Sequence, residues 1–304
     1  MNKRFLLVLL SLCATLTSIQ RGSAINQTDS TVYFGSYYPD NPLNSEIIED
    51  ASFGIYYRCT EKATDNSSKE VIELQDTLLL AVGKSVSLFF DQEFSTKYSK
   101  WIRENRVRGR KITNPRPPIV EPMTSLKNML DDASDIGHRD VGNPIHVYTY
   151  RNTGTVVSAD LFGSFLRTSQ QIPQFSQWTM ESGSEVILGY LCMKASSHYG
   201  GKHYTAYFTP EIPVSDGPWK FHGLPGMILK VSDDDSDFTY EAISLENFYE
   251  AVIVSSIADM TDSSPSQFEK ASNAKREEIV TVFLYQGSEY QAGEYPYALW
   301  TREQ

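Results

Sequence analysis

Short runs in which apolar and polar residues alternate recur along the chain from about residue 50 onward. Alternation with a period of two is typical of strands that bury one face, and these runs are rich in aromatic and β-branched residues. Turn-forming residues such as Gly83-Lys84 and Asn152-Thr-Gly154 separate them. The strands that the pattern predicts are 53–59, 71–82 (as one strand or two), 85–90, 145–150, 155–157, 185–195, 202–209, 227–231 and 238–243.

Tight turns between consecutive strands predict antiparallel pairing, and so many strands must curl, close or stack to bury their apolar face. We therefore expect a mainly β protein, built as an antiparallel curved sheet or half-open barrel with a few covering helices. Residues 51–304 are expected to form a single β-rich domain with a proline-interrupted excursion at about 95–142. Ser264-Pro265 predicts a helix that runs to about residue 282. Residues 25–50 are polar and turn-rich, which predicts a loose N-terminal lead.

The first 24 residues have the layout of a secretory signal peptide. Lys3 and Arg4 precede an apolar run from Phe5 to Leu12, and small residues follow at Gly22-Ser-Ala24. The apolar run is far shorter than the roughly 20 residues that span a bilayer, and no later stretch approaches that length. The sequence therefore predicts export to the periplasm or outside the cell, with cleavage after residue 24 and no transmembrane segment in the remainder.

The net charge excludes one class of partner. The chain carries a formal charge of −11, and the signal peptide holds three positive residues and no negative one, so the remainder is more acidic still. An acidic surface repels phosphate backbones, so we expect no binding to nucleic acid.

Three ordered motifs occupy the region from residue 187 to 231. They are Gly189-Tyr-Leu-Cys-Met-Lys-Ala195, Tyr204-Thr-Ala-Tyr-Phe-Thr-Pro-Glu-Ile-Pro213 and Gly217-Pro-Trp-Lys-Phe-His-Gly-Leu-Pro-Gly-Met-Ile-Leu229. In this order they resemble the GLPGLI family of exported proteins from double-membraned bacteria, whose hexapeptide is matched by Gly223-Leu-Pro-Gly-Met-Ile228. The resemblance covers roughly residues 70–270. It implies export, and it brings no established activity to any residue of this chain.

The proline-rich loop within this region is the candidate binding segment. Pro210, Pro213 and Pro218 bar helix and central-strand pairing nearby, so residues 210–226 form a stiff loop. Such a loop either closes the end of a β core as a lid or forms the rim of a ligand site, and lids are the commoner use. The candidate residues are Trp219, Phe221, His222, Gly223, Leu224, Pro225 and Gly226.

Metal chemistry finds only weak support in the sequence. His198 and His203 flank a glycine turn, and with His222 they are three histidines that could converge on zinc, but no carboxylate or cysteine pattern accompanies them. Asp233-Asp-Asp-Ser-Asp237 lacks the glycine and the bidentate glutamate of a calcium loop. We therefore expect surface histidines, a solvated hairpin loop, and no resident metal or cofactor.

Two cysteines remain beyond the signal peptide, Cys59 and Cys192. An oxidising compartment permits a disulfide between them, and the alternative is two buried thiols that never meet. Cys192 lies within a predicted strand, where cysteine usually packs, so it is a poor candidate nucleophile. Serine-hydrolase elbows, zinc-protease motifs and phosphate-cradling loops do not occur in the sequence. No catalytic residue is predicted.

The leading functional hypothesis is non-enzymatic: an envelope protein that binds a lipid-like or peptide ligand, or another envelope protein. The hairpin that follows the hexapeptide is similar to hairpins of periplasmic lipoprotein carriers, which is an analogy of fold alone. Two alternatives stay open. One is a hydrolytic enzyme with an unidentified site, and the other is a structural or interaction module of a surface assembly.

Overall fold

The structure, a computed structural model, describes a little over half of the chain, and every structural statement below concerns that part. The described residues are 31–35, 46–64, 71–93, 95, 145–161, 164–172, 178–199, 201–234, 238–255, 257–258, 260–272 and 274.

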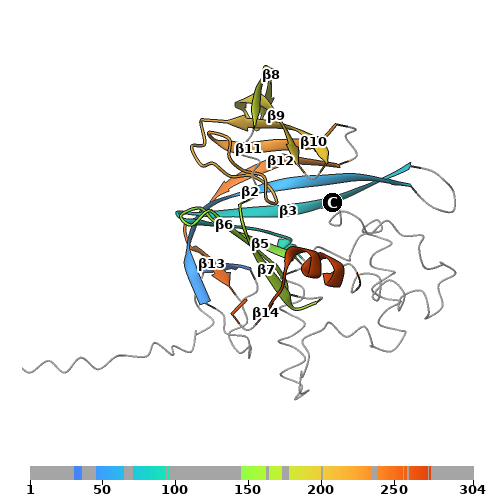
Figure 1. Cartoon of the computed structure of the whole chain (residues 1–304). Helices are drawn as coiled ribbons and strands as arrows, with labels where there is room; N and C mark the ends of the chain where they lie inside the picture. Colours follow the sequence, from blue (N-terminus) through green and yellow to red (C-terminus); the bar gives the residue numbers. More distant parts are fainter. Residues whose placement is uncertain are drawn as a thin grey trace, which may run out of the picture. The chain divides into compact units, whose positions relative to one another are not determined.

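These residues form one large, mostly antiparallel sheet of fourteen strands (Figure 1). The strand bounds are β1 Val32–Phe34, β2 Glu46–Thr64, β3 Val71–Gly83, β4 Val86–Phe90, β5 Ile145–Tyr150, β6 Thr155–Asp160, β7 Leu166–Gln171, β8 Thr179–Ile187, β9 Tyr190–Tyr199, β10 Lys202–Thr209, β11 Met227–Asp233, β12 Phe238–Asn247, β13 Ala251–Ser255 and β14 Thr261–Asp262. The order across the sheet is β14-β7-β6-β5-β4-β3-β2-β12-β11-β10-β9-β8. β13 pairs with β2 and with β1, and the β1–β13 and β7–β14 pairs are parallel.

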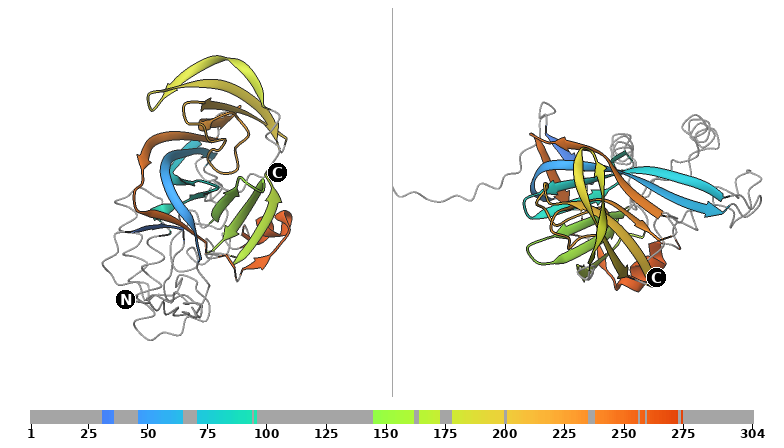
Figure 2. Two further views of the ribbon diagram at one scale, coloured as in Figure 1. Left: turned by 90° about the vertical axis from the view of Figure 1, so that its left-hand side faces the viewer. Right: turned by 90° about the horizontal axis from the view of Figure 1, so that it is seen from above.

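The β2–β3 hairpin lies at the centre and gives the sheet its curl. β2 pairs first with β13, from Glu46 to Asp50, and then with β12, from Phe53 to Glu61. Irregularities in the pairing of β2 with β3 and with β13 fall close to the point where it changes partner. Bulges bend a strand and increase its twist, so β2 curves from one half of the sheet to the other (Figure 2, left). The sheet does not close into a barrel, because β8 and β14 remain its two ends.

Side-chain alternation gives neighbouring strands β2, β12, β11, β10 and β9 one apolar and one polar face at the rows described next. Residues that register places side by side across five strands are buried on one face; they are Cys59, Tyr240, Val231, Ala206 and Ala195. The next row along the strands lies on the opposite face and is polar; it consists of Arg58, Glu241, Lys230, Tyr207 and Lys194. We call the first the core face and the second the outer face.

Strands β4, β5 and the part of β3 from residue 78 to 82 are instead buried on both faces. Leu80, Val82 and Phe89 belong to the larger hydrophobic cluster, whereas the alternate residues Leu79 and Leu88 belong to a second cluster with β1 and β13. A strand that is buried on both sides has apolar residues at consecutive positions. This explains why residues 78 to 82 of β3 are all apolar.

The mainly β, curved and largely antiparallel prediction is confirmed. One expectation was wrong: 185–195 is not a single strand but parts of β8 and β9, which meet at a turn where Leu188 and Gly189 both have positive φ. Residues 25–50 were expected to form a loose N-terminal lead, but they include β1 and the first residues of β2.

The predicted helix begins as expected at residue 265 and is described to residue 272. Ser264 caps it reciprocally with Gln267: Gln267 N donates to Ser264 Oγ at 3.3 Å, and Ser264 N donates to Gln267 Oε1 at 3.1 Å. The signal peptide and nearly all of the 95–142 excursion lie outside the described residues. Within the described part, no helix has the length and apolar character needed to cross a membrane.

Candidate functional site

The predicted loop 210–226 packs onto the core face of the sheet. Phe221 and Leu224 are buried in the larger cluster, and the Phe221 ring lies edge-on to Tyr204 with 5.1 Å between centroids. The loop returns to the sheet through two backbone bonds, from Met227 N to Ile212 O at 3.1 Å and from the following amide to the Asp216 carbonyl at 2.9 Å. The loop therefore covers part of the core face.

Glycine is required where the loop passes closest to the sheet. Gly226 has a φ of 152°, and a Cβ at this position would lie 2.1 Å from the carbonyl oxygen of Thr209. Gly223 and Trp219 also have positive φ values, of 96° and 56°. The glycines of the hexapeptide thus serve a tight, packed turn rather than an open one.

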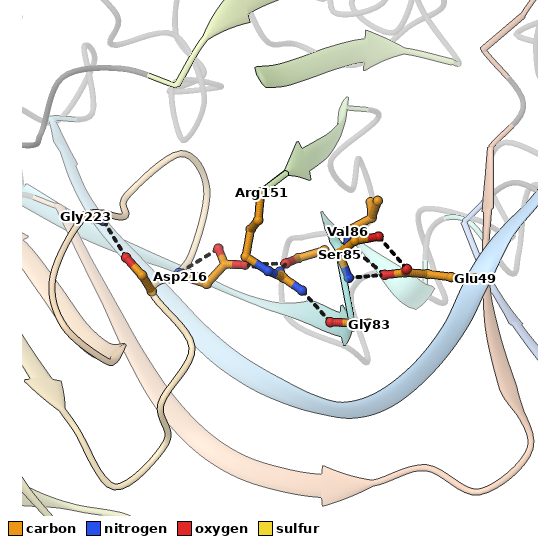
Figure 3. A network of polar contacts seen from close by, with 10 residues as sticks. Glu49, Gly83, Ser85, Val86, Arg151, Asp216 and Gly223 are labelled. Carbon is orange, nitrogen blue, oxygen red and sulfur yellow. Dashed lines mark hydrogen bonds and ion pairs between the residues drawn. The ribbon is translucent and has the colours of Figure 1, made fainter. Parts of the chain in front are cut away.

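A buried charge network fastens this loop to the β3–β4 and β5–β6 turns (Figure 3). Arg151 Nη1 lies 2.8 Å from Asp216 Oδ2 and also donates to Ser87 Oγ, while its Nη2 donates to the Gly83 carbonyl. Ser87 donates to the same Asp216 oxygen, and Gly217 N donates to Oδ1 at 2.9 Å. Asp216 is only 2% exposed. Burial raises the pKa of Asp216, and the hydrogen bond from Ser87 and the charge of Arg151 partly offset that rise.

Glu49 extends the same network on the neighbouring strand. Its carboxylate accepts hydrogen bonds from Ser85 N at 2.8 Å, Ser85 Oγ at 2.6 Å and Val86 N at 2.6 Å. Burial alone raises the pKa of Glu49, but these hydrogen bonds and the charge of Arg151 bring it below its usual value. Glu49 therefore caps the β3–β4 turn as a carboxylate.

This network holds the loop in place and offers no reachable nucleophile. Ser87 is fully buried, and its hydroxyl is already bonded to both charged partners. A substrate would have to displace the loop to reach it. The arrangement supports a structural role for the loop, as a lid closed over the core.

The seven candidate residues fall into three groups by exposure. Phe221, Leu224 and Gly226 are buried, Trp219 and His222 are half-buried, and Gly223 and Pro225 are exposed. The His222 carbonyl accepts a hydrogen bond from Trp178 Nε1 at 2.9 Å, and burial lowers the pKa of its ring.

The structure brings together one pair that sequence reasoning missed. Ser95 Oγ lies 3.1 Å from His146 Nε2, the distance expected between a serine nucleophile and its base. Both residues are buried, and the His146 ring stacks on Phe90 at 5.3 Å between centroids. Fifty-one residues separate the two, so no local motif could have revealed the pair.

Only two of the three histidines considered for zinc come together. His198 and His203 are register partners on β9 and β10, whereas His222 lies in the lid loop. Within the described ranges, no group of three or more histidine, cysteine or acidic side chains could hold a metal ion. In the acidic run, Asp233 accepts from the amide of Phe238 at 3.0 Å and closes the β11–β12 turn.

Cys59 and Cys192 are both buried thiols, so the structure depicts the unbridged state of the chain. Burial raises the pKa of Cys192 to about 11, which leaves little thiolate at neutral pH. This agrees with a packing role for Cys192.

Four of the seven exposed large apolar residues in the described part of the chain lie at the β8 end of the sheet. Val186 and Leu191 are register partners on β8 and β9 and are 67% and 55% exposed. Leu188 in the turn between them and Met180 near the start of β8 are exposed as well. We call Met180, Val186, Leu188 and Leu191 the edge patch.

Comparison with known proteins supports the family resemblance over one part of the chain. Residues 198–230 match a family model described as "Protein of unknown function (Porph_ging)", a bacterial family often called GLPGLI. The matched region contains β10, the lid loop and the start of β11. No curated protein matches the chain.

Two solved structures of PNGF-II, in the P21 and C2 space groups, are similar to the chain at low identity. Each is 13% identical and covers 74% of this chain, with TM-scores of 0.47 and 0.46. The matches cover 34% and 33% of those proteins, so the chain spans about a third of the length of the solved structures that it matches.

Proposed function

We propose that this protein is an exported, non-enzymatic binding protein that takes an extended segment of another envelope protein along strand β8. The observation that carries the proposal is the edge patch, a group of exposed apolar side chains on β8, at the start of β9 and in the turn between them. An exposed apolar surface at a strand edge is typical of protein interaction sites. The signal peptide predicted for residues 1–24 supports the compartment.

The edge patch lies beside the buried core at the β8–β9 turn. Register places Val186 beside Leu191 and places Ile187 beside Tyr190. Ile187 and Cys192 are buried in the larger cluster, so their chain neighbours Val186 and Leu191 point away from that cluster. A bound segment with alternating apolar residues would therefore cover Val186 and Leu191 on the exposed side of the hairpin.

Strand addition also suits the backbone of β8. β8 is the last strand of the described sheet, so its outer edge has no partner strand there. Strand-adding ligands obtain affinity from main-chain hydrogen bonds and specificity from alternate side chains. The carboxylates of β8 do not repel a bound strand, because each is paired with a lysine. Glu181 lies 2.9 Å from the Lys194 ammonium, and Glu185 lies 2.8 Å from the Lys230 ammonium.

The structure favours a protein segment over a lipid or a second copy of the chain. The lid already fills its part of the core face with Phe221 and Leu224, which removes space that a lipid tail would use. Antiparallel self-pairing of β8 centred on Gly183 would place Glu181 of one copy opposite Glu185 of the other. Like charges directly opposite destabilise a strand pair.

A displayed library of ten-residue peptides tests the proposal. We expect selection against the folded protein to enrich peptides with alternating apolar residues, and their affinity is then measured by fluorescence anisotropy. The double variant Val186→Glu/Leu191→Glu should lose at least about tenfold in affinity, because it buries two charges against apolar side chains. Ser184→Pro should lose a similar factor, because proline removes a main-chain donor from the strand.

The control is Ile47→Glu, which adds one of the two charges at an exposed apolar residue on β2. It should bind the selected peptides like the original protein. Equal affinity for all four proteins would contradict the proposal, and so would selection of peptides without an apolar alternation. Recovery of the protein in the cytoplasmic fraction of a double-membraned bacterium would contradict the exported compartment.

One observation favours a second candidate, a serine hydrolase that uses Ser95 and His146. Their 3.1 Å distance fits a nucleophile and base, and their burial opposes it. A fluorophosphonate probe distinguishes the two functions. Labelling of Ser95 that disappears in His146→Ala would favour the hydrolase, whereas an unlabelled serine is the outcome that the binding function predicts.

A further inference from the structure

We propose that His198 and His203 form a chelating site for a divalent late transition-metal ion, with Cu²⁺ the most tightly bound. The two residues are direct register partners on neighbouring antiparallel strands. Their rings lie 4.3 Å apart between centroids with an interplanar angle of 52°. They lie on the outer face, because His198 is an even number of residues from Lys194.

The ring separation is the one that a shared metal ion needs. A metal–nitrogen bond is about 2.0 Å long, and the nitrogen lies roughly 1.2 Å from the ring centre, so each centroid lies about 3.2 Å from the ion. When the two nitrogens bind at a right angle, the centroids are then about 4.5 Å apart. The observed separation of 4.3 Å requires only a small adjustment.

Asp234 already orients one of the two imidazoles. His203 Nδ1 is hydrogen-bonded to Asp234 Oδ1; because a carboxylate accepts, Nδ1 carries a proton, and Nε2 is the nitrogen that binds a metal ion when the ring is neutral. A carboxylate on the second ring nitrogen is the usual support of a metal-binding histidine, because it fixes the tautomer and raises ligand basicity. His198 is exposed, so a metal ion and its waters can reach the pair.

Two carboxylates and one ammonium lie near the imidazole pair. Glu181 is close enough for the charge of His203 to lower the pKa of the Glu181 carboxyl, after the larger effects of its bonds to Ser196 and Lys194. Asp234 lies on the opposite side, directly after β11. The two carboxylates flank the imidazole pair, and the Lys194 ammonium, 2.9 Å from Glu181 and within range of Asp234, offsets part of their negative charge.

Two imidazoles select a particular class of metal. Tetragonal sites with nitrogen and oxygen ligands suit Cu²⁺ and Ni²⁺, which complete their coordination with water. Divalent affinity rises to a maximum at Cu²⁺ and falls again at Zn²⁺, so the same pair should prefer Cu²⁺. A site of this kind needs no third protein ligand, which is consistent with the lack of a larger metal-binding group in the described ranges.

A competition titration of the full chain with Cu²⁺ and a chromophoric chelator tests the site. We expect His198→Ala and His203→Ala each to weaken Cu²⁺ binding more than tenfold. Asp234→Asn should weaken it by about tenfold or less, because it removes only the support of one ring. His222→Ala is the control, since it removes a histidine of the lid loop and should leave the affinity unchanged.

Electron paramagnetic resonance provides a readout that a fold defect cannot imitate. The original protein should show Cu²⁺ bound by two nitrogens, and each single variant should show at most one. Unchanged affinity in both single variants would overturn the proposal, and so would a spectrum without two coupled nitrogens. Thermal unfolding without metal should be the same for all variants, because both rings lie at the surface. Neither result bears on peptide binding at β8.

Discussion

Replacing Arg151 with methionine is the sharpest test of how the lid is held. The guanidinium bonds Asp216, Ser87 and the Gly83 carbonyl at once, and it is largely buried. Methionine fills a similar volume but offers no charge and no donor. The variant therefore leaves the Asp216 carboxylate buried with only Ser87 and the Gly217 amide as partners.

The structure sets the size of the effect. Removing one partner of a buried ion pair costs about 3–5 kcal/mol, because the remaining charge has lost both water and its counterion. Arg151 retains 18% exposure, so we expect the lower end, about 3 kcal/mol. For a chain of 304 residues that corresponds to a fall of roughly 5 °C in the unfolding midpoint. Urea unfolding of the two proteins at pH 7 measures the difference directly.

The pH dependence identifies the cause. Burial raises the pKa of Asp216, so its neutral form contributes stability that is fully present below the unfolded pKa of about 3.9 and is lost as pH rises through the folded value. Without Arg151, that folded pKa rises further. The loss of stability in Arg151→Met should therefore be smallest near pH 4 and should grow towards pH 7.

Asp262→Asn is the matched control, because it breaks the Arg167–Asp262 ion pair, in which Asp262 is 76% exposed. Exposed pairs contribute little to stability, so this variant should unfold almost like the original protein. An Arg151→Met variant that loses no more stability than Asp262→Asn would refute the buried-pair reasoning. A loss that does not change between pH 4 and pH 7 would refute the role of the Asp216 charge.

Three further predictions follow from individual contacts. Gly226→Ala should destabilise the protein in urea by more than about 2 kcal/mol, since its Cβ would overlap a carbonyl oxygen; Gly189→Ala, with nothing within 4 Å, should cost only about 1 kcal/mol. Cys192 should resist iodoacetamide at pH 8 until the chain unfolds, because its pKa is raised to about 11, and peptide mapping that finds it alkylated in the folded protein would contradict this. Asp160→Ala removes the acceptor of three hydrogen bonds, so it should increase hydrogen exchange across the helix at 265–272; unchanged exchange there would disprove the link.

The strands that could be predicted from the sequence are those with clear alternation or a clear turn. Residues 145–150 match β5 in full, and the Gly83-Lys84 turn joins β3 to β4 as expected. Strand β8 was recognised only at its end. Because β8 is exposed on both faces, its apolar and polar residues do not alternate. A register irregularity between Met180 and Ser184 interrupts the pattern further. β13 was missed for the opposite reason, because it is buried throughout.

The candidate loop was predicted from its prolines and glycines, but its attachment could not be. Arg151 and Asp216 are 65 residues apart, and only the order of strands across the sheet brings the β5–β6 turn to the lid. The same holds for Ser95 and His146. Local sequence specifies turns and faces, whereas these contacts depend on which strands become neighbours.

Strand β9 explains how one short hairpin can support two separate proposals. Leu191, near the start of β9, is exposed beside Val186 of β8, and the even-numbered residues from Lys194 to His198 lie on the outer face. The two candidate sites are therefore separated along the strand, since Leu191 and His198 are seven residues apart. Side chains alternate between the two faces of a strand. A shift of one residue in the pairing of β8 with β9 would therefore move every side chain of β8 to the other face of the hairpin. The positive-φ turn at Leu188-Gly189 fixes that register, and it therefore determines which residues of the hairpin can meet a partner strand.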